Sequence, residues 1–214
     1  MILYKTAYKR AEASIEIKRS KFIAHGTPVD TIEQARAFIE EIKEMHKDAT
    51  HNVPAFIVGN KMEHMWASDD GEPQGTSGPP ILKLLENEGI TNIALVVTRY
   101  FGGTKLGTGG LVRAYTDAVK AYLDVAGLAF GMDMRRLRLK LDYDKYSILE
   151  KNITNFRGRI DKVEYDQRVH VDVVIPVEDE EGFEGYLSNL ALGRRVIEEK
   201  KDIISLIKAD KYNL

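Results

Sequence analysis

The segment VVTRYFGGTKLGTGGLVR (residues 96–113) carries an apolar run directly into a glycine-rich turn. Residues 93–97 are all apolar, which predicts a strand covered on both faces within a mixed sheet packed by helices. Five glycines then interrupt regular structure, and apolar residues return at helical spacing. The segment therefore predicts a strand, a glycine turn and a helix whose buried face holds Leu111, Tyr115, Ala118 and Tyr122.

Elements before this segment follow from periodicity and capping residues. Alternating Ile15 and Ile17 and the apolar run at 22–24 predict two strands. Thr31 and Gln34 form a capping-box pattern, which predicts a helix that reaches Met45. The remaining predicted elements are strands at 53–58 and 62–68, a loop at 69–80, and a helix at 81–88 closed by Gly89.

The pattern resets near residues 127–133, where we expect a boundary between domains at 1–130 and 131–214. The second half has the β-α-β-β-α-β order of a ferredoxin-like domain. The predicted class is therefore α+β, an N-terminal α/β domain followed by a ferredoxin-like domain. The predicted elements of the second half are strands at 137–141, 160–165, 169–175 and 195–198, and helices at 148–156 and 178–190.

Several classes of function are excluded. Thr108 stands where a phosphate-binding loop needs lysine, and Val112 stands where a dinucleotide fingerprint needs its third glycine. The absence of cysteine excludes disulfides, thiolate nucleophiles and cysteine-based metal sites. A net charge of −2 gives no overall attraction to nucleic acid or to anionic membrane, so such binding needs a local patch. No apolar run approaches the roughly 20 residues of a bilayer span, and we expect a cytoplasmic protein without membrane association.

The glycine turn has the chemistry of an anion site. Backbone N–H groups in such a turn point into a concavity, and the following helix adds partial positive charge at its N-terminus. Arg99, Lys105 and Arg113 strengthen this preference, because no acidic residue lies among them. The alternative is that the glycines only permit positive φ angles and close packing.

Acidic residues gather in the loop at 69–80. Asp69, Asp70 and Glu72 offer oxygen ligands that suit Mg²⁺, although they lack the spacing of an EF-hand loop. The alternatives are acid–base chemistry, a solvated turn, and ion pairs with Arg99 or Arg113 across a groove. His51 is similarly either a ligand or a hydrogen-bonded residue at a strand start.

Cations also alternate with leucines in the second half, at Arg136, Arg138 and Lys140, and so project from one face of a strand. An RNA-binding sheet would place cations in this way. However, the aromatic ribonucleoprotein signature is absent, and Asp142 and Asp172 dilute the charge. The favoured interpretation is a solvated sheet face.

Four runs of residues resemble the YigZ/Impact family. They are KFIA (21–24), DATH (48–51), DDGEPQGTSG (69–78) and VTRYFGGTKLG (97–107), the last continued by RAY (113–115). The resemblance rests on motifs in the first half and on domain order in the rest. Ser77 replaces the usual alanine, and Val53 replaces a common cysteine, which argues against a cysteine-dependent activity.

The resemblance implies an N-terminal domain similar to the second domain of small-subunit ribosomal protein five, and a C-terminal domain similar to those of elongation factor G. Eukaryotic members of the family regulate translation by competing for the activator of the starvation-responsive kinase of initiation factor two. We therefore expect a non-enzymatic regulator that binds RNA, the ribosome or a translation factor, with another protein partner as a further alternative. The competing hypothesis is a Mg²⁺-dependent enzyme that acts on a phosphorylated small molecule or nucleotide; otherwise no cofactor is expected.

The expected binding site is a groove between the acidic loop and the glycine turn. In this groove Arg99, Lys105 and Arg113 would contact phosphates, while Tyr100 and Phe101 would stack on a base or pack inward. No catalytic residue is expected. The complete set of expected ligand-binding residues is His51, Asp69, Asp70, Glu72, Gly75, Thr76, Arg99, Tyr100, Phe101, Gly102, Gly103, Lys105, Gly107, Gly109, Gly110 and Arg113.

Overall fold

The computed structural model describes residues 1–209, which form two compact units. The N-terminal unit comprises Tyr4–Gly131 and the described residues from Leu206 on, and the C-terminal unit comprises Met1–Leu3 and Met132–Ser205. Five α-helices and two sheets occur in the described chain, so the predicted mixture of helices and strands is confirmed. Within residues 1–209, every helix falls short of the length or the apolar character that a bilayer span requires.

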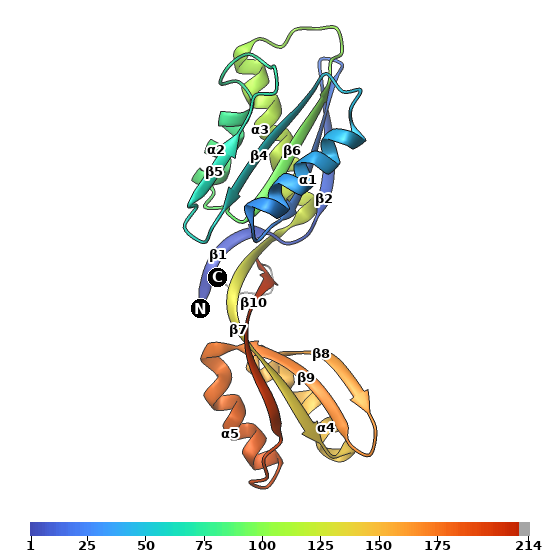
Figure 1. Cartoon of the computed structure of the whole chain (residues 1–214), viewed down its shortest axis with the longest axis vertical. Coiled ribbons are helices and arrows are strands. Elements are labelled where there is room, and N and C mark those ends of the chain that lie inside the picture. The colour runs from blue at the N-terminus through green and yellow to red at the C-terminus, as the bar shows by residue number, and fades with distance from the viewer. Residues whose placement is uncertain (210–214) are drawn as a thin grey trace. The chain divides into compact units, whose positions relative to one another are not determined.

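A five-stranded sheet forms the centre of the N-terminal unit (Figure 1). All its pairings are antiparallel, so the prediction of a mixed sheet is wrong: the central strand enters between two hairpins and runs against both neighbours. The predicted burial of that strand on both faces is confirmed. In spatial order the strands are β2 (Ala11–Ile17), β3 (Ser20–Pro28), β6 (Ile93–Tyr100), β4 (His51–Val58) and β5 (His64–Ala67).

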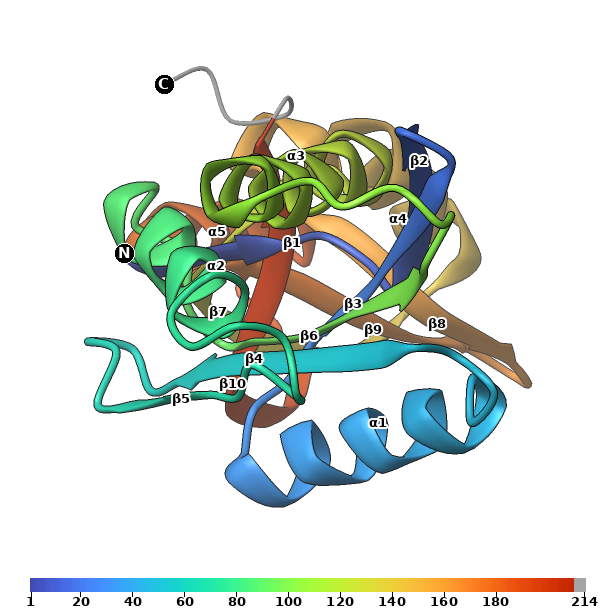
Figure 2. The same ribbon diagram turned by 90° about the horizontal axis from the view of Figure 1, so that it is seen from above.

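Helices cover both faces of this sheet (Figure 2). Helix α1 (Ile32–Met45) packs on one face, and α2 (Gly78–Asn87) and α3 (Thr108–Ala126) pack on the other. The capping box of α1 is confirmed, because Thr31 Oγ1 accepts the Gln34 N–H at 3.2 Å. The predicted inner face of α3 is also confirmed, since Leu111, Tyr115, Ala118 and Tyr122 are all buried.

The β-α-β-β-α-β order predicted for the second half is observed. Its strands lie in the order β10-β7-β9-β8, and both helices contribute to one apolar core on the sheet. Strand β1 (Ile2–Ala7) also pairs with β7. The elements are β7 (Leu128–Leu141), α4 (Tyr143–Asn152), β8 (Arg159–Tyr165), β9 (Val169–Pro176), α5 (Glu180–Leu190) and β10 (Ile197–Lys208), with short 3-10 helices η1 (Ile153–Phe156) and η2 (Val177–Asp179).

Element ends differ from the sequence predictions where polar residues hide the periodicity. Strand β1 has no counterpart among the predicted elements. Strand β10 continues to Lys208, and the sequence does not predict this extension because the charged residues 198–202 show no apolar alternation. Helix α4 begins at Tyr143 rather than at residue 148, since its first turn is polar. Helix α2 begins at Gly78 rather than at residue 81, with both prolines in its first turn.

Candidate functional site

The glycine turn (residues 101–107) lies against the turn between β2 and β3, at one end of the N-terminal sheet (Figures 1 and 2). A Cβ atom at Gly102 would lie 2.0 Å from the carbonyl carbon and oxygen of Arg19. Ser20 Oγ accepts the Gly102 N–H at 3.1 Å, and Thr50 Oγ1 accepts the Phe101 N–H at 3.0 Å. Only glycine fits at position 102, and its close approach brings the two turns together.

The other glycines of the predicted site have different roles. Gly103 and Gly107 have φ angles of 82° and 77°, in the left-handed region that favours glycine. At Gly110 a Cβ would lie 3.0 Å from the Cβ of Leu106. Gly109 has neither requirement, because its backbone is helical and a Cβ there would meet no atom of residues 1–209 within 4 Å. The space beside Gly109 is therefore open to a ligand.

Helix α3 begins beside this open space without a side-chain cap. Gly107 is its N-cap residue, and no side chain of the described chain bonds to the N–H groups of the first turn. Uncapped N–H groups carry partial positive charge and are satisfied by water or by an anionic ligand. The amide groups that the sequence assigns to anion binding thus remain available at this helix end.

Five cations lie on the two turns, at the start of β3 and near the start of α3. All five are exposed, and none of them forms an ion pair within residues 1–209. The β2–β3 turn is not among the predicted site residues. In the sequence, the feature that indicates this turn is a group of three cations within four residues, between two predicted strands. We call these five residues the basic loop cluster: Lys18, Arg19, Lys21, Lys105 and Arg113.

Arg99 is not part of this cluster. Its side chain is 6% exposed, and Nη1 donates to Glu72 Oε1 at 2.6 Å. The guanidinium carbon lies 5.3 Å from the ring centre of Phe22 and 5.4 Å from that of Phe101. The carboxylate neutralises Arg99, which is the ion-pair alternative that the sequence leaves open.

Glu72 is the centre of a buried polar group. Besides Arg99, Tyr115 donates its hydroxyl hydrogen to Glu72 Oε1 at 2.7 Å. Burial, together with the hydrogen bond to this carboxylate, raises the pKa of Tyr115 far above its usual value. His51 Nε2 lies 3.8 Å from the other carboxylate oxygen, and His51 Nδ1 lies 2.7 Å from the carbonyl oxygen of Asp70. These contacts hold the acidic loop onto β6 and α3.

Asp69 supports the start of α2. Its carboxylate accepts the N–H groups of Gly75, Ser77 and Gly78 at 2.7, 3.0 and 3.0 Å, and the Ser77 hydroxyl at 2.6 Å. Burial opposes ionisation, but these four bonds outweigh it and hold the pKa of Asp69 below its usual value. Within the same loop, Gly75 has a φ of 77° and Thr76 Oγ1 donates to the Pro73 carbonyl oxygen at 2.6 Å.

Asp70 makes a third, separate set of contacts. Its carboxylate accepts the Asn52 N–H at 2.6 Å and lies 3.7 Å from Lys43 Nζ. The three carboxylates of the acidic loop therefore serve three different sets of partners. Among the described residues, no three His, Asp or Glu side chains are grouped so that they could hold a metal ion.

The two aromatic residues before the glycines differ in accessibility. The Tyr100 hydroxyl lies 2.9 Å from His46 Nδ1 and 3.3 Å from Asp48 Oδ1, which ties this side chain to the end of α1. Phe101 is 47% exposed. Of the two rings, Phe101 is thus the more exposed, and Tyr100 is half-buried.

The cations of the C-terminal sheet are paired. Arg136 Nη2 lies 3.2 Å from Asp161, Arg138 Nη1 lies 3.0 Å from Asp172, and Lys140 Nζ lies 4.0 Å from Glu198. Arg138 also contacts Glu164. These pairs support the interpretation of a solvated sheet face.

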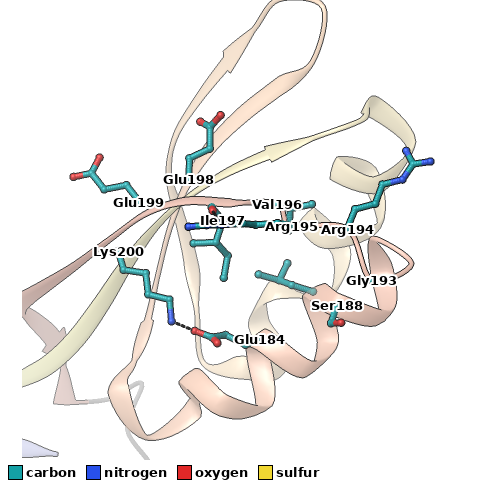
Figure 3. A pocket seen from close by; sticks show the side chains of 11 residues that line it. Glu184, Ser188, Gly193, Arg194, Arg195, Val196, Ile197, Glu198, Glu199 and Lys200 are labelled. Carbon is teal, nitrogen blue, oxygen red and sulfur yellow. Dashed lines mark hydrogen bonds and ion pairs between the residues drawn. The ribbon is translucent and has the colours of Figure 1, made fainter.

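A cleft of about 570 Å³ lies between α5 and β10 in the C-terminal unit (Figure 3). Lys200 contacts Glu184 across it, and Arg195 Nε donates to the Ile197 carbonyl oxygen at 3.3 Å. The side chain of Arg194 points away from these residues (Figure 3). Of the cations that line this cleft, Lys200 is therefore paired, Arg195 is bonded to the backbone, and Arg194 is turned away.

Comparison with known proteins identifies the family. A family model described as the Impact N-terminal domain matches residues 18–123. The chain is 34% identical over 196 residues to "IMPACT family member YvyE" of Bacillus subtilis, covering 92% of this chain and 90% of that protein. The chain belongs to the IMPACT family. The family resemblance inferred from the sequence is thus confirmed.

Other comparisons extend over both units of this IMPACT-family chain. It is 34% identical over 180 residues to "IMPACT family member YigZ" of Escherichia coli, which covers 83% of this chain and 88% of that protein. A solved structure described as "an hypothetical protein" is 30% identical with a TM-score of 0.58, and 96% of each chain is covered. The range of the IMPACT N-terminal model contains the whole basic loop cluster and the acidic loop. The similarity to domains of ribosomal protein five and elongation factor G stays a prediction.

Proposed function

We propose that this IMPACT-family chain is a non-enzymatic, translation-associated regulator that binds RNA through the basic loop cluster. The observation that supports this most is a set of five exposed cations without an ion pair to any of residues 1–209, on two touching turns and near the starts of β3 and α3. Lysine and arginine on such a surface bind phosphates, and the uncapped N–H groups of α3 add further donors. The cluster supplies the local patch that the net charge of the chain does not.

The acidic loop favours a binding role over the metal-dependent enzyme. An enzyme that acts on phosphates through Mg²⁺ needs carboxylates directed at the metal. Here Glu72 accepts from Arg99 and Tyr115, and Asp69 accepts from the start of α2. These carboxylates stabilise the fold around the cluster. Membership of the family supports the role in translation, because the resemblance implies that its eukaryotic members regulate that process.

The test is retention of ribosomes and RNA from a cell extract by the immobilised full chain, with and without nuclease. We expect nuclease-sensitive retention that Arg113→Ala weakens. The matched control is Arg194→Ala, because Arg194 is also an exposed arginine without an ion pair within residues 1–209, but lies in the other unit. Retention that survives nuclease and depends on the cluster would instead support a protein partner. No retention at low salt would contradict the proposal.

A further inference from the structure

We propose that Phe101 is a stacking platform for an unpaired base, so that the RNA bound at the basic loop cluster is single-stranded. This inference rests on the proposed function and specifies its ligand. It starts from the position of Phe101, which is 47% exposed at the point where β6 leaves the sheet.

Phe101 is held in place from behind. The guanidinium of Arg99 lies over its ring, 5.4 Å from the ring centre, and Arg99 itself is fixed by the 2.6 Å contact to Glu72. The Phe101 N–H bonds to Thr50 Oγ1, and the next residue, Gly102, bonds to Ser20. Phe101 thus has a buried cation on one side of its ring, and its backbone is anchored. It therefore loses little side-chain entropy when a base stacks on the exposed surface of the ring.

The surroundings of Phe101 select the chemistry of the ligand. Its neighbour Gly102 lies against the backbone of Arg19 in the β2–β3 turn, and Lys105 lies in the same glycine turn as Phe101. Five cations and an accessible ring complement a chain that carries phosphates and bases together, and an apolar protein segment would leave the cations unpaired. Charge complementarity therefore favours nucleic acid over an apolar protein segment as the ligand.

Stacking also selects the strandedness. A base within a duplex is already stacked on both faces, so an exposed ring gains a contact only with an unstacked base. Duplex RNA would contact the cations but would not stack on the ring. Each stacked base contributes a factor of about 5 to 150 in affinity, which sets the size of the expected effect.

The experiment measures fluorescence anisotropy of a labelled 12-nucleotide RNA, single-stranded or annealed to its complement, with the full-length chain. The variants are Phe101→Ala, Phe101→Trp and the control Trp66→Ala. Trp66 matches Phe101 in exposure, at 46%, but lies on strand β5 and stacks on Phe56. Thermal melting of each variant confirms that it is folded.

We expect the single strand to bind more tightly than the duplex, and Phe101→Ala to lower the single-strand affinity by about 5- to 150-fold. The salt dependence should not change, because a ring releases no counterions. Phe101→Trp should restore affinity, and Trp66→Ala should have no effect. Equal binding of both RNAs, or an unchanged affinity in Phe101→Ala, overturns the stacking proposal while leaving RNA binding in place. No binding of either RNA by the unaltered chain overturns the proposed function together with it.

Discussion

Glu72 and Arg99 form an ion pair of 2.6 Å with side chains only 3% and 6% exposed, and this pair joins the acidic loop to the central strand. Because Arg99 lies two residues before the glycine turn, the pair holds the acidic loop close to that turn. Glu72 neutralises Arg99, and Arg99 supports Phe101. The cations left for a ligand are therefore those of the basic loop cluster.

Removal of one partner should destabilise the N-terminal unit strongly. Glu72→Ala leaves the Arg99 guanidinium buried and unpaired, which we expect to lower the free energy of unfolding by about 3–5 kcal/mol. Urea denaturation measures the change. Glu86→Ala is the control, because the Lys83–Glu86 pair is exposed and should be worth less than about 1 kcal/mol. Equal effects of the two substitutions would contradict the assigned role of Glu72.

Two buried tyrosines of α3 provide a matched test of the same polar group. The Tyr115 hydroxyl donates to Glu72, whereas the Tyr122 hydroxyl has no hydrogen-bond partner in the described part of the chain. Tyr115→Phe should therefore lower the unfolding free energy by about 1.5–3 kcal/mol, the usual contribution of a bond to a charged group. Tyr122→Phe should leave it unchanged or raise it. The reverse order in thermal or urea unfolding would be inconsistent with the hydrogen bonds described.

The free energy of unfolding should decrease in mild acid because of His25. Burial lowers the pKa of this side chain below its ordinary 6.5, and the facing His46 and nearby Arg10 act in the same direction, while Glu12 opposes them. The unfolded chain then binds a proton that the folded chain does not, so the unfolding free energy falls as the pH drops through 6.5. Urea unfolding between about pH 7.5 and 5.5 should show a shallower decrease in His25→Gln. An identical pH profile in the two proteins would refute this assignment.

The glycines of the turn should respond differently to alanine. Gly109→Ala should raise the unfolding free energy by up to about 1 kcal/mol, since the position is helical and open. The same substitution should weaken RNA binding, because the new methyl group occupies the space beside the α3 amides. Gly102→Ala should instead destabilise by about 1–3 kcal/mol through its clash with Arg19. Circular dichroism melts and anisotropy measure the two effects, and unaltered RNA affinity in Gly109→Ala would argue against a ligand at this helix end.

Local features of the fold were predictable from the sequence. The capping residue Thr31 and the apolar positions of α3 are set by neighbours within one or two helical turns, and both predictions are confirmed. The antiparallel direction of β6 was not predictable, because apolar content shows burial without showing which strands lie alongside. Likewise, β10 carries a charged run that conceals its strand.

For a similar reason, the sequence indicates only some of the cations of the candidate site. Arg99, Lys105 and Arg113 are recognisable as cations near a glycine turn. The burial of Arg99 depends on its ion pair with Glu72. The β2–β3 turn joins the site because β3 pairs with β6, which places Phe22 opposite Arg99. Both are contacts between residues far apart in the chain. A motif indicates the chemistry of its own residues but not which other charges the fold brings to it.

The most direct test of the central claim is the salt dependence of RNA affinity for the variant Arg19→Ala, Lys105→Ala and Arg113→Ala combined. For the unaltered chain, the logarithm of the association constant should fall steeply with the logarithm of salt concentration. The combined variant should bind more weakly, with a slope smaller by about 0.7 for each phosphate of a single strand that the variant no longer neutralises. A slope and an affinity equal to those of the unaltered chain would contradict the account.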